Sequence, residues 1–382
     1  MIYWDHNATT PLRPEVAELL RASVGAPFGN PSSVHQAGRK ARLRLETARQ
    51  RVAAVLGCEP KEIIFTGSGT DGDALCVKGA FFARKDPRRT GVVISAIEHP
   101  AVLHAASQLE KHAARVTRVK PDANGVVASV AELLRGRGGD DVAVCSLMWA
   151  NNETGVLQPV REVARACRER GVLFHTDAVQ VIGKVPVTLR DCDADLLTIA
   201  AHKFGGPPGV GACVIRKGVN VEALSPGHQE NGRRGGTQNV PYVEALALAL
   251  ELAAKDAESY AARVGALRDR FERAVLQQLP GTRVNGAEAP RVPNTSNITF
   301  SGADGEALLI ALDLAGICVS TGAACASGSL SPSHVLTAMG LSSEQAHQSL
   351  RFSLGAETTE GDVERVIAAL IEAVPRVRAE AA

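Results

Sequence analysis

The sequence predicts an α/β fold with a mostly parallel sheet, on the basis of two observations. Between about residues 60 and 216, short β-rich runs alternate with helical patterns, as they do where helices connect parallel strands. The chain of 382 residues is also longer than one hydrophobic core usually serves, so we expect a second, smaller domain. Ligands of such sheets bind where the strands end, which is where a site is expected.

Short apolar runs are the expected strands of the larger domain. They are 63–65 (IIF), 92–95 (VVIS), 142–147 (VAVCSL), 172–176 (VLFHT), 196–200 (LLTIA) and 210–215 (VGACVI). From Val240 to Leu279 a helical periodicity predicts one long helix or two, which suit a connection between domains. The second domain should contain a strand at 296–300, a helix at 304–315 and a terminal helix after Thr359, joined by the first dozen residues.

Composition and charge exclude several classes of protein. Hydrophobic residues make up 45% and charged residues 22%, as in soluble globular proteins, and 42 basic against 41 acidic residues create no field that would attract nucleic acid or a membrane. No apolar run approaches membrane-spanning length and no signal-peptide pattern is present, so we expect a cytoplasmic protein.

The eight cysteines include no CxxC pair, and we expect reduced thiols, mostly buried in apolar runs.

A glycine-rich turn, 66–72 (TGSGTDG), follows the first expected strand and precedes a helical pattern. Free N–H groups at a helix N-terminus bind anions, glycines let the backbone approach a ligand, and Thr70 adds a hydroxyl. Gly67, Gly69 and Gly72 also match the dinucleotide pattern GxGxxG. Taken alone, the turn fits a dinucleotide, another phosphate ligand or a plain tight turn.

Asp177 stands at the C-terminal end of the strand 172–176, with Gln180 three residues later. A carboxylate that faces a pyridine nitrogen keeps that nitrogen protonated and makes the ring an electron sink, as pyridoxal 5′-phosphate (PLP) chemistry requires. Asp177 is therefore a candidate PLP partner, and a helix N-cap is its alternative role.

Lys203 lies in a glycine- and proline-rich loop, 200–209 (AAHKFGGPPG), after another strand. A lysine that is partly desolvated loses pKa and forms a Schiff base with an aldehyde cofactor. His99 follows the strand 92–95 and is placed to stack on an aromatic ring, and Asn152 offers an amide for a ring substituent. We expect purely structural roles for the histidines at 104, 112 and 175.

Cys325 differs from the other cysteines because it lies in a stretch rich in Gly, Ala and Ser, at about 320–332. The absence of periodicity there predicts a flexible, exposed loop. A free thiol is a few per cent thiolate at neutral pH, yet strongly nucleophilic, and a mobile loop would let one sulfur reach a substrate and later an acceptor. Cys325 is therefore the candidate nucleophile.

A series of motifs runs in order along nearly the whole chain. They are 3–11 (YWDHNATTP), 28–38 (FGNPSSVHQAG), 151–155 (NNETG), 175–180 (HTDAVQ), 202–203 (HK), 233–237 (RRGGT), 320–340 (STGAACASGSLSPSHVLTAMG) and 350–355 (LRFSLG). In these motifs the sequence resembles the cysteine desulfurases of the NifS and IscS group, which are PLP enzymes of the aminotransferase class V type. The length of the cysteine loop resembles the members with a long catalytic loop.

The resemblance implies an aspartate aminotransferase-like fold, with a large PLP-binding domain at 14–255. The small α+β domain would consist of 1–13 and 256–382 and would include the catalytic cysteine loop. The resemblance also implies a homodimer.

For the cofactor ring, the resemblance implies that Lys203 binds PLP covalently and that His99 stacks on the ring. Asp177 would face the pyridine nitrogen, and Gln180 the phenolic oxygen, with Asn152 beside it. The implied phosphate ligands are Gly69, Thr70 and His202 of one chain and Thr237 of the other chain of the homodimer.

For the substrate, the resemblance implies that Asn30 and Arg351 hold the carboxylate of L-cysteine, and a guanidinium matches a carboxylate with two parallel hydrogen bonds. Lys203 would take the α-proton, and the Cys325 thiolate would attack the substrate sulfur. The products would be L-alanine and a persulfide on Cys325, whose sulfur passes to an acceptor such as an iron–sulfur scaffold protein. No metal is implied.

Other functions use only part of these residues. A selenocysteine lyase or a class V aminotransferase would share Lys203 and Asp177, but an aminotransferase would not need Cys325. A dinucleotide dehydrogenase would leave Lys203, Asp177 and Arg351 without a role. An inactive scaffold for cluster assembly is disfavoured, because the lysine and the cysteine are both present.

Two positions depart from the family pattern. Ala200 stands where a phosphate-binding serine is usual, and Asn231 stands where an arginine is usual. A hydroxyl lost from a phosphate site costs on the order of 1–3 kcal/mol of binding free energy if nothing replaces it. The departures therefore bear on the affinity for PLP and on the entrance of the pocket.

Overall fold

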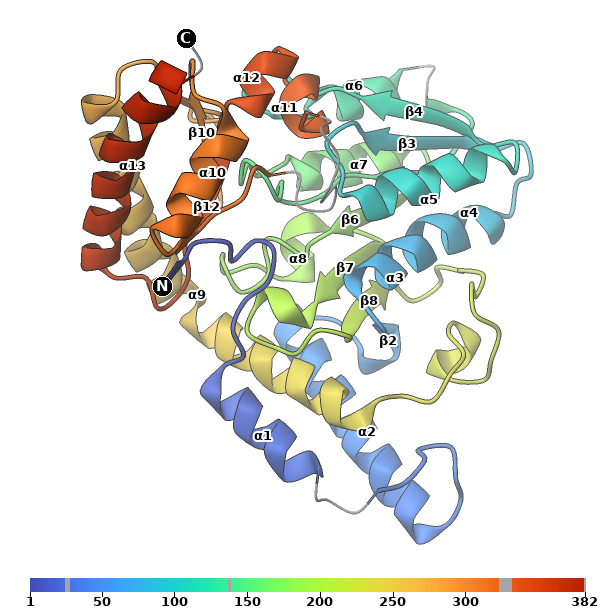
Figure 1. Cartoon of the computed structure of the whole chain (residues 1–382). Coiled ribbons are helices and arrows are strands. Elements are labelled where there is room, and N and C mark those ends of the chain that lie inside the picture. The colour runs from blue at the N-terminus through green and yellow to red at the C-terminus, as the bar shows by residue number, and fades with distance from the viewer. Residues whose placement is uncertain (25–27, 137–138, 323–331, 381–382) are drawn as a thin grey trace.

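A seven-stranded sheet forms the centre of the larger part of the molecule (Figure 1). The computed structural model describes residues 1–24, 28–136, 139–322 and 332–380. The strand order is β2-β8-β7-β6-β5-β3-β4, in which β8 pairs antiparallel with β2 and β7 while the other pairs are parallel. The strands are β2 (Ile63–Thr66), β3 (Gly91–Ser95), β4 (Arg115–Val119), β5 (Val142–Ser146), β6 (Leu173–Asp177), β7 (Leu196–Ala200) and β8 (Gly211–Ile215). The predicted mostly parallel sheet is confirmed, and β4 is an edge strand that the sequence pattern did not reveal.

Helices cover both faces of this sheet, because side chains that alternate along each strand enter two separate cores. Ile63 and Phe65 belong to one core, and Ile64 between them belongs to the other. The first core includes residues of α2 (Gln36–Leu56), α6 (Ser129–Arg135), α7 (Val160–Glu169) and α9 (Val240–Gln278). The second core includes residues of a π-helical turn, η2 (Leu75–Gly79), and of α4 (Ala80–Phe82) and α5 (Pro100–Glu110), and α3 (Gly69–Ala74) precedes η2.

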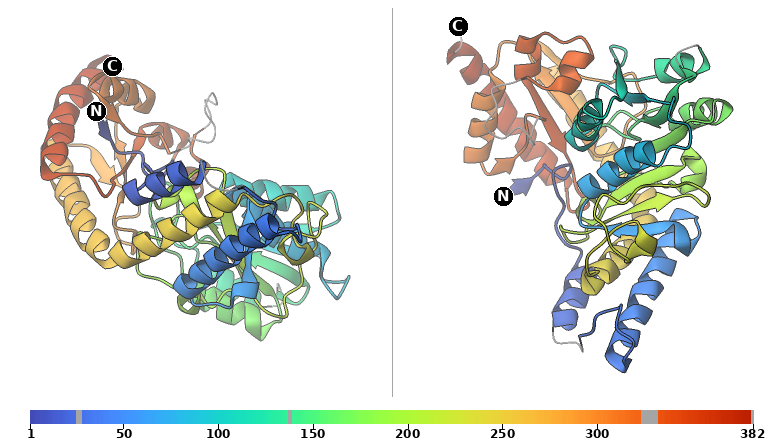
Figure 2. Two further views of the ribbon diagram at one scale, coloured as in Figure 1. Left: turned by 90° about the horizontal axis from the view of Figure 1, so that it is seen from below. Right: turned by 90° about the vertical axis from the view of Figure 1, so that its right-hand side faces the viewer.

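The region 240–279, for which the sequence allowed one helix or two, is the single helix α9. Its first half, up to Ala253, contributes to the core of the large sheet, and its second half, from Val264, contributes to a third core. The helix therefore connects the two parts of the molecule, and it lies beside α1 (Pro14–Val24) and α2 (Figure 2).

The third core lies around a smaller antiparallel sheet of order β12-β10-β9. Its strands are β9 (Thr282–Val284), β10 (Thr295–Phe300) and β12 (Ser349–Ser353), and a short parallel pair is formed by β1 (Ile2–Tyr3) and β11 (Ile317–Cys318). Trp4 packs edge-on against Phe271 and Phe352 in this core, which joins the chain start, α9 and β12. The predicted strand at 296–300, helix at 304–315 and terminal helix correspond to β10, α10 (Gly305–Leu314) and α13 (Glu360–Glu380).

Helices α10 and α13 lie at one end of the molecule and the α1–α2 connection lies at the other (Figures 1 and 2). Between these ends, the chain from β1 to α1 passes the loop after β7, where the backbone N–H of Thr10 donates to the His202 carbonyl at 2.9 Å. The remaining short helices are η1 (Pro60–Glu62), α8 (Leu189–Cys192), η4 (Ala201–Lys203), η5 (Glu230–Gly232), α11 (His334–Ala338) and α12 (Ser343–His347). Within the described ranges, no helix combines the length and the apolar character needed to cross a membrane.

Candidate active site

Most of the predicted cofactor residues lie at one edge of the large sheet. Strands β3, β5, β6 and β7 are parallel neighbours in the sheet, and β2 has the same direction because both β2 and β7 are antiparallel to β8. Residues that follow these strands therefore meet at their shared carboxyl edge. They are the turn at 67–70 after β2, His99 after β3, Asn152 after β5, Asp177 at the end of β6, and His202 and Lys203 after β7.

The glycine turn after β2 lies closely against the ends of two other strands. A methyl group on Gly69 would lie 3.2 Å from Val179 Cγ2 and 3.3 Å from Ala200 Cβ, so glycine allows this approach without displacing those side chains. Thr70 is exposed in the first turn of α3. The Asp71 N–H there donates to the Ser68 hydroxyl at 3.1 Å, which leaves the N–H groups of Gly69 and Thr70 for an anion. This cradle fits the phosphate group of PLP.

The position of Ala200 leads to a prediction. Because its Cβ faces Gly69, a hydroxyl added by Ala200→Ser should gain a charge-assisted hydrogen bond to the phosphate. We expect a roughly tenfold lower Kd for PLP, the equivalent of about 1.4 kcal/mol. Equilibrium dialysis of PLP against both proteins measures the change. Equal or weaker binding by Ala200→Ser would show that another group already occupies this position.

Asp177 is buried at the end of β6, where one carboxylate oxygen accepts a hydrogen bond from the Val179 N–H at 2.9 Å. Burial raises the pKa of the Asp177 carboxyl, while His99 and Lys203 lower it. A buried carboxylate is stabilised by a cationic hydrogen-bond donor. The N–H of a pyridinium ring is such a donor, so Asp177 fits the cofactor ring.

Burial favours the neutral form of the two histidines at this edge. Burial lowers the pKa of His99, and its Nδ1 accepts a hydrogen bond from the Ala101 N–H at 3.2 Å, which caps α5. Burial also lowers the pKa of His202 to about 4, with Lys203 and His99 acting in the same direction. A neutral His99 ring suits stacking on an aromatic ring, and a neutral His202 offers one N–H to a phosphate.

Residues of the motif at 3–11 lie beside Lys203 and contact it. The Lys203 ammonium donates to the carbonyl oxygens of Asn7 at 2.6 Å and Ala8 at 2.7 Å. The hydroxyl of Thr10 donates to the His202 carbonyl at 2.9 Å and accepts from the Gly205 N–H at 2.9 Å. The start of the chain thus positions the lysine loop.

Asn7 and Lys184 support the site, although sequence reasoning assigned them no role. The buried Lys184 ammonium donates to Asn7 Oδ1 at 2.7 Å and to Gln180 Oε1 at 2.5 Å, and the Gln180 amide donates to the Asn7 carbonyl at 2.9 Å. Burial lowers the pKa of Lys184, and Lys203 and Arg351 act in the same direction. These contacts orient the Gln180 amide. The available signal was a lone lysine within the apolar run 181–187.

Arg351 is 2% exposed on β12 and is already paired within the chain. Its guanidinium donates to Asp5 Oδ1 at 2.6 Å and to the Asn152 carbonyl at 2.9 Å. The Nε–H is buried and has no hydrogen-bond partner among the described residues. Arg351 therefore joins β12, the chain start and the turn after β5, and these contacts leave its Nε–H unused.

The pairing with Asp5 changes the expectation for substitutions of Arg351. From the sequence alone, Arg351→Ala is expected to raise the KM for cysteine with little effect on folding. Removing one partner of a buried ion pair costs about 3–5 kcal/mol of stability, and Asp5 would be left unpaired. Arg351→Ala should therefore destabilise the protein as well, which revises the expectation of normal folding.

Arg351→Lys is the sharper substitution, because it keeps a positive charge for Asp5 and loses the planar, forked donor. We expect a KM for cysteine roughly 10- to 100-fold higher, with a smaller change in kcat. Steady-state kinetics of alanine formation measure both, and Arg283→Lys, an exposed change on β9 of the same sheet, is the matched control. A normal KM in Arg351→Lys would place the carboxylate clamp elsewhere.

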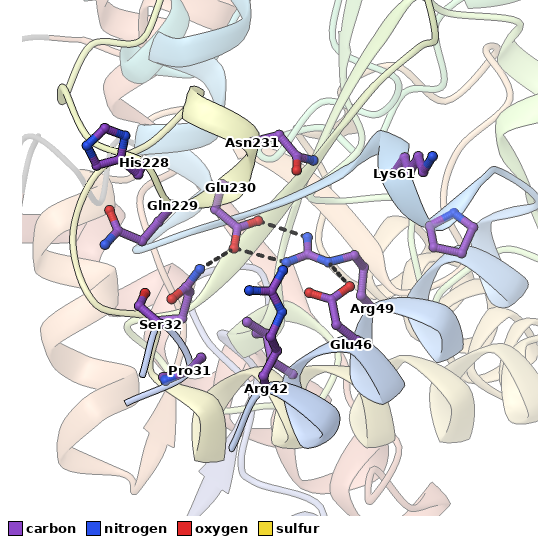
Figure 3. Close-up of a pocket in the computed structure, with 13 residues that line it drawn as sticks. Pro31, Ser32, Arg42, Glu46, Arg49, Lys61, His228, Gln229, Glu230 and Asn231 are labelled. Atoms are coloured by element: carbon purple, nitrogen blue, oxygen red, sulfur yellow. Dashed lines mark hydrogen bonds and ion pairs between the residues drawn. The ribbon is translucent and has the colours of Figure 1, made fainter. Parts of the chain in front are cut away.

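Asn30 and Arg351 lie on segments that are far apart within one chain. Asn30 is exposed in the described part of the connection between α1 and α2, and this connection lies at the opposite end of the molecule from β12 (Figure 1). Its neighbours Pro31 and Ser32 line a hollow of about 260 Å³ together with Gln238, the residue after Thr237 (Figure 3). The segments of Asn30 and Thr237 thus flank one hollow, and none of the other predicted site residues lines it.

The left-handed turn at Glu230 and Asn231 shapes this hollow (Figure 3). The φ angles are 49° and 58°, and asparagine enters this region more readily than arginine does. The strained Glu230 is held by two bonds from the buried Arg49 guanidinium, at 2.8 and 3.0 Å, and by the Phe65 N–H at 2.9 Å. The local backbone therefore gives a physical reason for asparagine at position 231.

Cys325 lies outside the described residues. Of the seven other cysteines, five are buried as expected, at positions 76, 145, 167, 192 and 213. Cys58 and Cys318 are half-buried, so the expectation of burial is wrong for these two. Both lie at the end of an element, Cys58 just after α2 and Cys318 at the end of β11, where cover by other elements is incomplete. Burial nevertheless raises the pKa of the Cys58 thiol to about 12, which makes it a poor nucleophile.

Similarity to known proteins extends over nearly the whole chain. Residues 2–366 match the family described as aminotransferase class-V. The chain is 43% identical over 380 residues to a cysteine desulfurase of Trichormus azollae, covering 99% of this chain and 94% of the relative. It is also 43% identical over 378 residues to the cysteine desulfurase IscS of Methanosarcina thermophila, covering 99% and 93%. A solved structure of a NifS-like protein aligns with a TM-score of 0.90 at 35% identity, covering 98% of this chain and 99% of the other.

Proposed function

The chain belongs to the aminotransferase class-V family, and on that premise we propose that it is a PLP-dependent cysteine desulfurase. It converts L-cysteine to L-alanine and takes the sulfur onto an enzyme cysteine. The observation that supports this function most strongly is that Lys203, Asp177 and His99 meet at one sheet edge, in a chain whose relatives are named cysteine desulfurases.

PLP, when bound, supplies an aldehyde carbon that bonds an amino group and a ring that stores negative charge. Lys203 is the proposed site of covalent attachment, and Asp177 holds the ring nitrogen protonated. His99 covers the ring, and Gln180, oriented by Lys184, faces the phenolic oxygen with Asn152 beside it. The proposed phosphate ligands are Gly69, Thr70 and His202.

Lys203 is the proposed base for the α-proton of cysteine. A base must be deprotonated before it accepts a proton. When Lys203 becomes protonated, the carbonyls of Asn7 and Ala8 are available to stabilise its ammonium. Arg351 holds the substrate carboxylate meanwhile.

The sulfur step uses Cys325. Its thiolate attacks the substrate sulfur, a sulfur–sulfur bond forms, and the carbon–sulfur bond of the substrate breaks with its electron pair left on carbon. That carbon is then protonated, and L-alanine leaves. Atoms and electrons balance without an added oxidant, and the persulfide on Cys325 is the form in which sulfur is passed on.

A homodimer is part of the proposal. Thr237 would reach the phosphate site of the second chain, and the hollow that the segments of Asn30 and Thr237 flank suggests that Asn30 comes from the same partner. This assignment explains why the α1–α2 connection, which carries Asn30, lies at the opposite end of the molecule from β12, which carries Arg351 (Figure 1). The proposed location is the cytoplasm, and the proposed acceptor is a protein such as an iron–sulfur scaffold.

Product analysis tests the function. Incubation with L-cysteine, PLP and a reductant should yield alanine and sulfide in equal amounts, with no keto acid. A class V aminotransferase would instead form a keto acid from cysteine. A preference for selenocysteine, with negligible alanine from cysteine, would favour a selenocysteine lyase.

A further inference from the structure

Glu153 contacts both ends of the segment that contains Cys325. It lies in the turn after β5 and is 2% exposed. Its Oε2 accepts a hydrogen bond from the Ser333 hydroxyl at 2.5 Å. On the other side Gly322, which has a φ of 92°, passes so close that a methyl group on it would lie 2.8 Å from the same oxygen. One buried carboxylate oxygen therefore meets the chain just before residue 323 and just after residue 331.

The first of these ends is also fixed to Arg351. The Arg351 N–H donates to the Ser320 carbonyl at 2.6 Å, and the Ser320 N–H donates back at 3.2 Å. The Ser320 hydroxyl accepts from the Gly322 N–H at 3.1 Å. The Arg351 guanidinium also donates to the carbonyl of Asn152, the residue before Glu153. Arg351, Glu153 and the segment 320–322 are therefore connected by hydrogen bonds and close packing.

The second end suits a carboxylate acceptor. The Ser333 hydroxyl accepts from the Leu336 N–H at 3.1 Å, which caps α11, so its single hydrogen is available to Glu153. Burial raises the pKa of Glu153, and the Ser333 hydroxyl, His334 and Arg351 lower it. A hydrogen bond between a hydroxyl and a buried carboxylate is among the stronger ones in proteins.

We propose that Glu153 is a positioning residue for the sulfur step. By accepting the Ser333 hydroxyl and packing closely against Gly322, it sets the separation of these two residues, which flank the segment with Cys325, and it places both relative to Arg351. The inference rests on the proposed function. Because attack of one sulfur on another requires alignment, a misplacement of about 1 Å costs up to about 10²-fold in rate.

The test separates the sulfur step from the steps before it. Glu153→Ala should lower kcat for alanine formation roughly 10- to 100-fold. PLP content, the absorbance change on cysteine binding and the exchange of the substrate α-hydrogen should stay within about twofold of wild type, because Lys203 and Arg351 are untouched. Single-turnover mass spectrometry should show correspondingly slow persulfide formation on Cys325.

Conservative variants separate positioning from a general role in folding. Glu153→Gln keeps an oxygen that accepts the Ser333 hydroxyl and should recover most of the rate. Glu153→Asp keeps the charge but draws the oxygen back by one methylene, and it should show the slow sulfur step even if Glu153→Ala does not fold. A general loss of structure would instead lower PLP content and α-hydrogen exchange together with the rate.

The Ser333 contact has its own control. Ser333→Ala should also slow the sulfur step. Adding Glu153→Ala to Ser333→Ala should lower the rate of that step by a smaller factor than Glu153→Ala does in the wild type. Ser342→Ala, which removes the exposed serine cap of α12, controls for the loss of a helix cap and should leave kcat unchanged. Wild-type rates of persulfide formation in Glu153→Ala and Glu153→Asp would overturn the inference. A wild-type protein that forms no alanine would contradict the proposed function instead.

Discussion

Lys203→Ala is expected to purify without the visible absorption band of bound PLP and to form alanine at least about 10³-fold more slowly than the wild type. The substitution removes both the covalent attachment and the base for the α-proton. Lys184, the other lysine nearby, does not replace it, because its ammonium is buried and bonded to Gln180 and Asn7. Absorbance spectra and alanine assays of the two proteins measure the loss.

Two additions sharpen this test. Supplying a small primary amine should restore part of the visible band in Lys203→Ala, because an amine then bonds the cofactor in place of the lysine. Lys184→Met, which replaces the other buried lysine with an apolar side chain of similar size, should keep the band. An unchanged spectrum in Lys203→Ala would remove Lys203 from its proposed role.

The expected strands could be found from the sequence because local composition decides them. The run IIF at 63–65 became β2, and its alternate side chains enter different cores, as expected for a sheet covered on both faces. The direction of β8 could not be found, because the pattern of an apolar run is the same in parallel and antiparallel strands. The strand β4 was missed because it lies at the sheet edge and contains exposed arginines, so its sequence is not apolar.

The contacts between distant residues could not be found. Asp5 and Arg351 are 346 residues apart in the chain, and nothing in their local sequence indicates that they form an ion pair. Asn7 likewise lies 177 residues from Lys184, and its Oδ1 accepts a hydrogen bond from the Lys184 ammonium. The sequence indicated which residues follow strand ends, and only the fold shows which other side chains hold them in place.

Removing only the nucleophile of the sulfur step should have an equally large effect on turnover. Cys325→Ser should keep its PLP, because no proposed contact to the cofactor involves Cys325. With cysteine added, Lys203 should still take the α-proton, so the substrate α-hydrogen should exchange with solvent. A serine hydroxyl is barely ionised at neutral pH and does not accept sulfur as a persulfide, so turnover should stop. Cys318 is half-buried, and Cys318→Ser is therefore the control for a second accessible thiol.

Alanine release by the wild type, Cys325→Ser and Cys318→Ser, measured with reductant present and beside α-hydrogen exchange, shows whether Cys325 is the sulfur nucleophile. All three proteins should exchange the α-hydrogen, the wild type and Cys318→Ser should release alanine, and Cys325→Ser should release none above background. Alanine release by Cys325→Ser at the wild-type rate would contradict the desulfurase mechanism and leave a PLP lyase that needs no cysteine nucleophile.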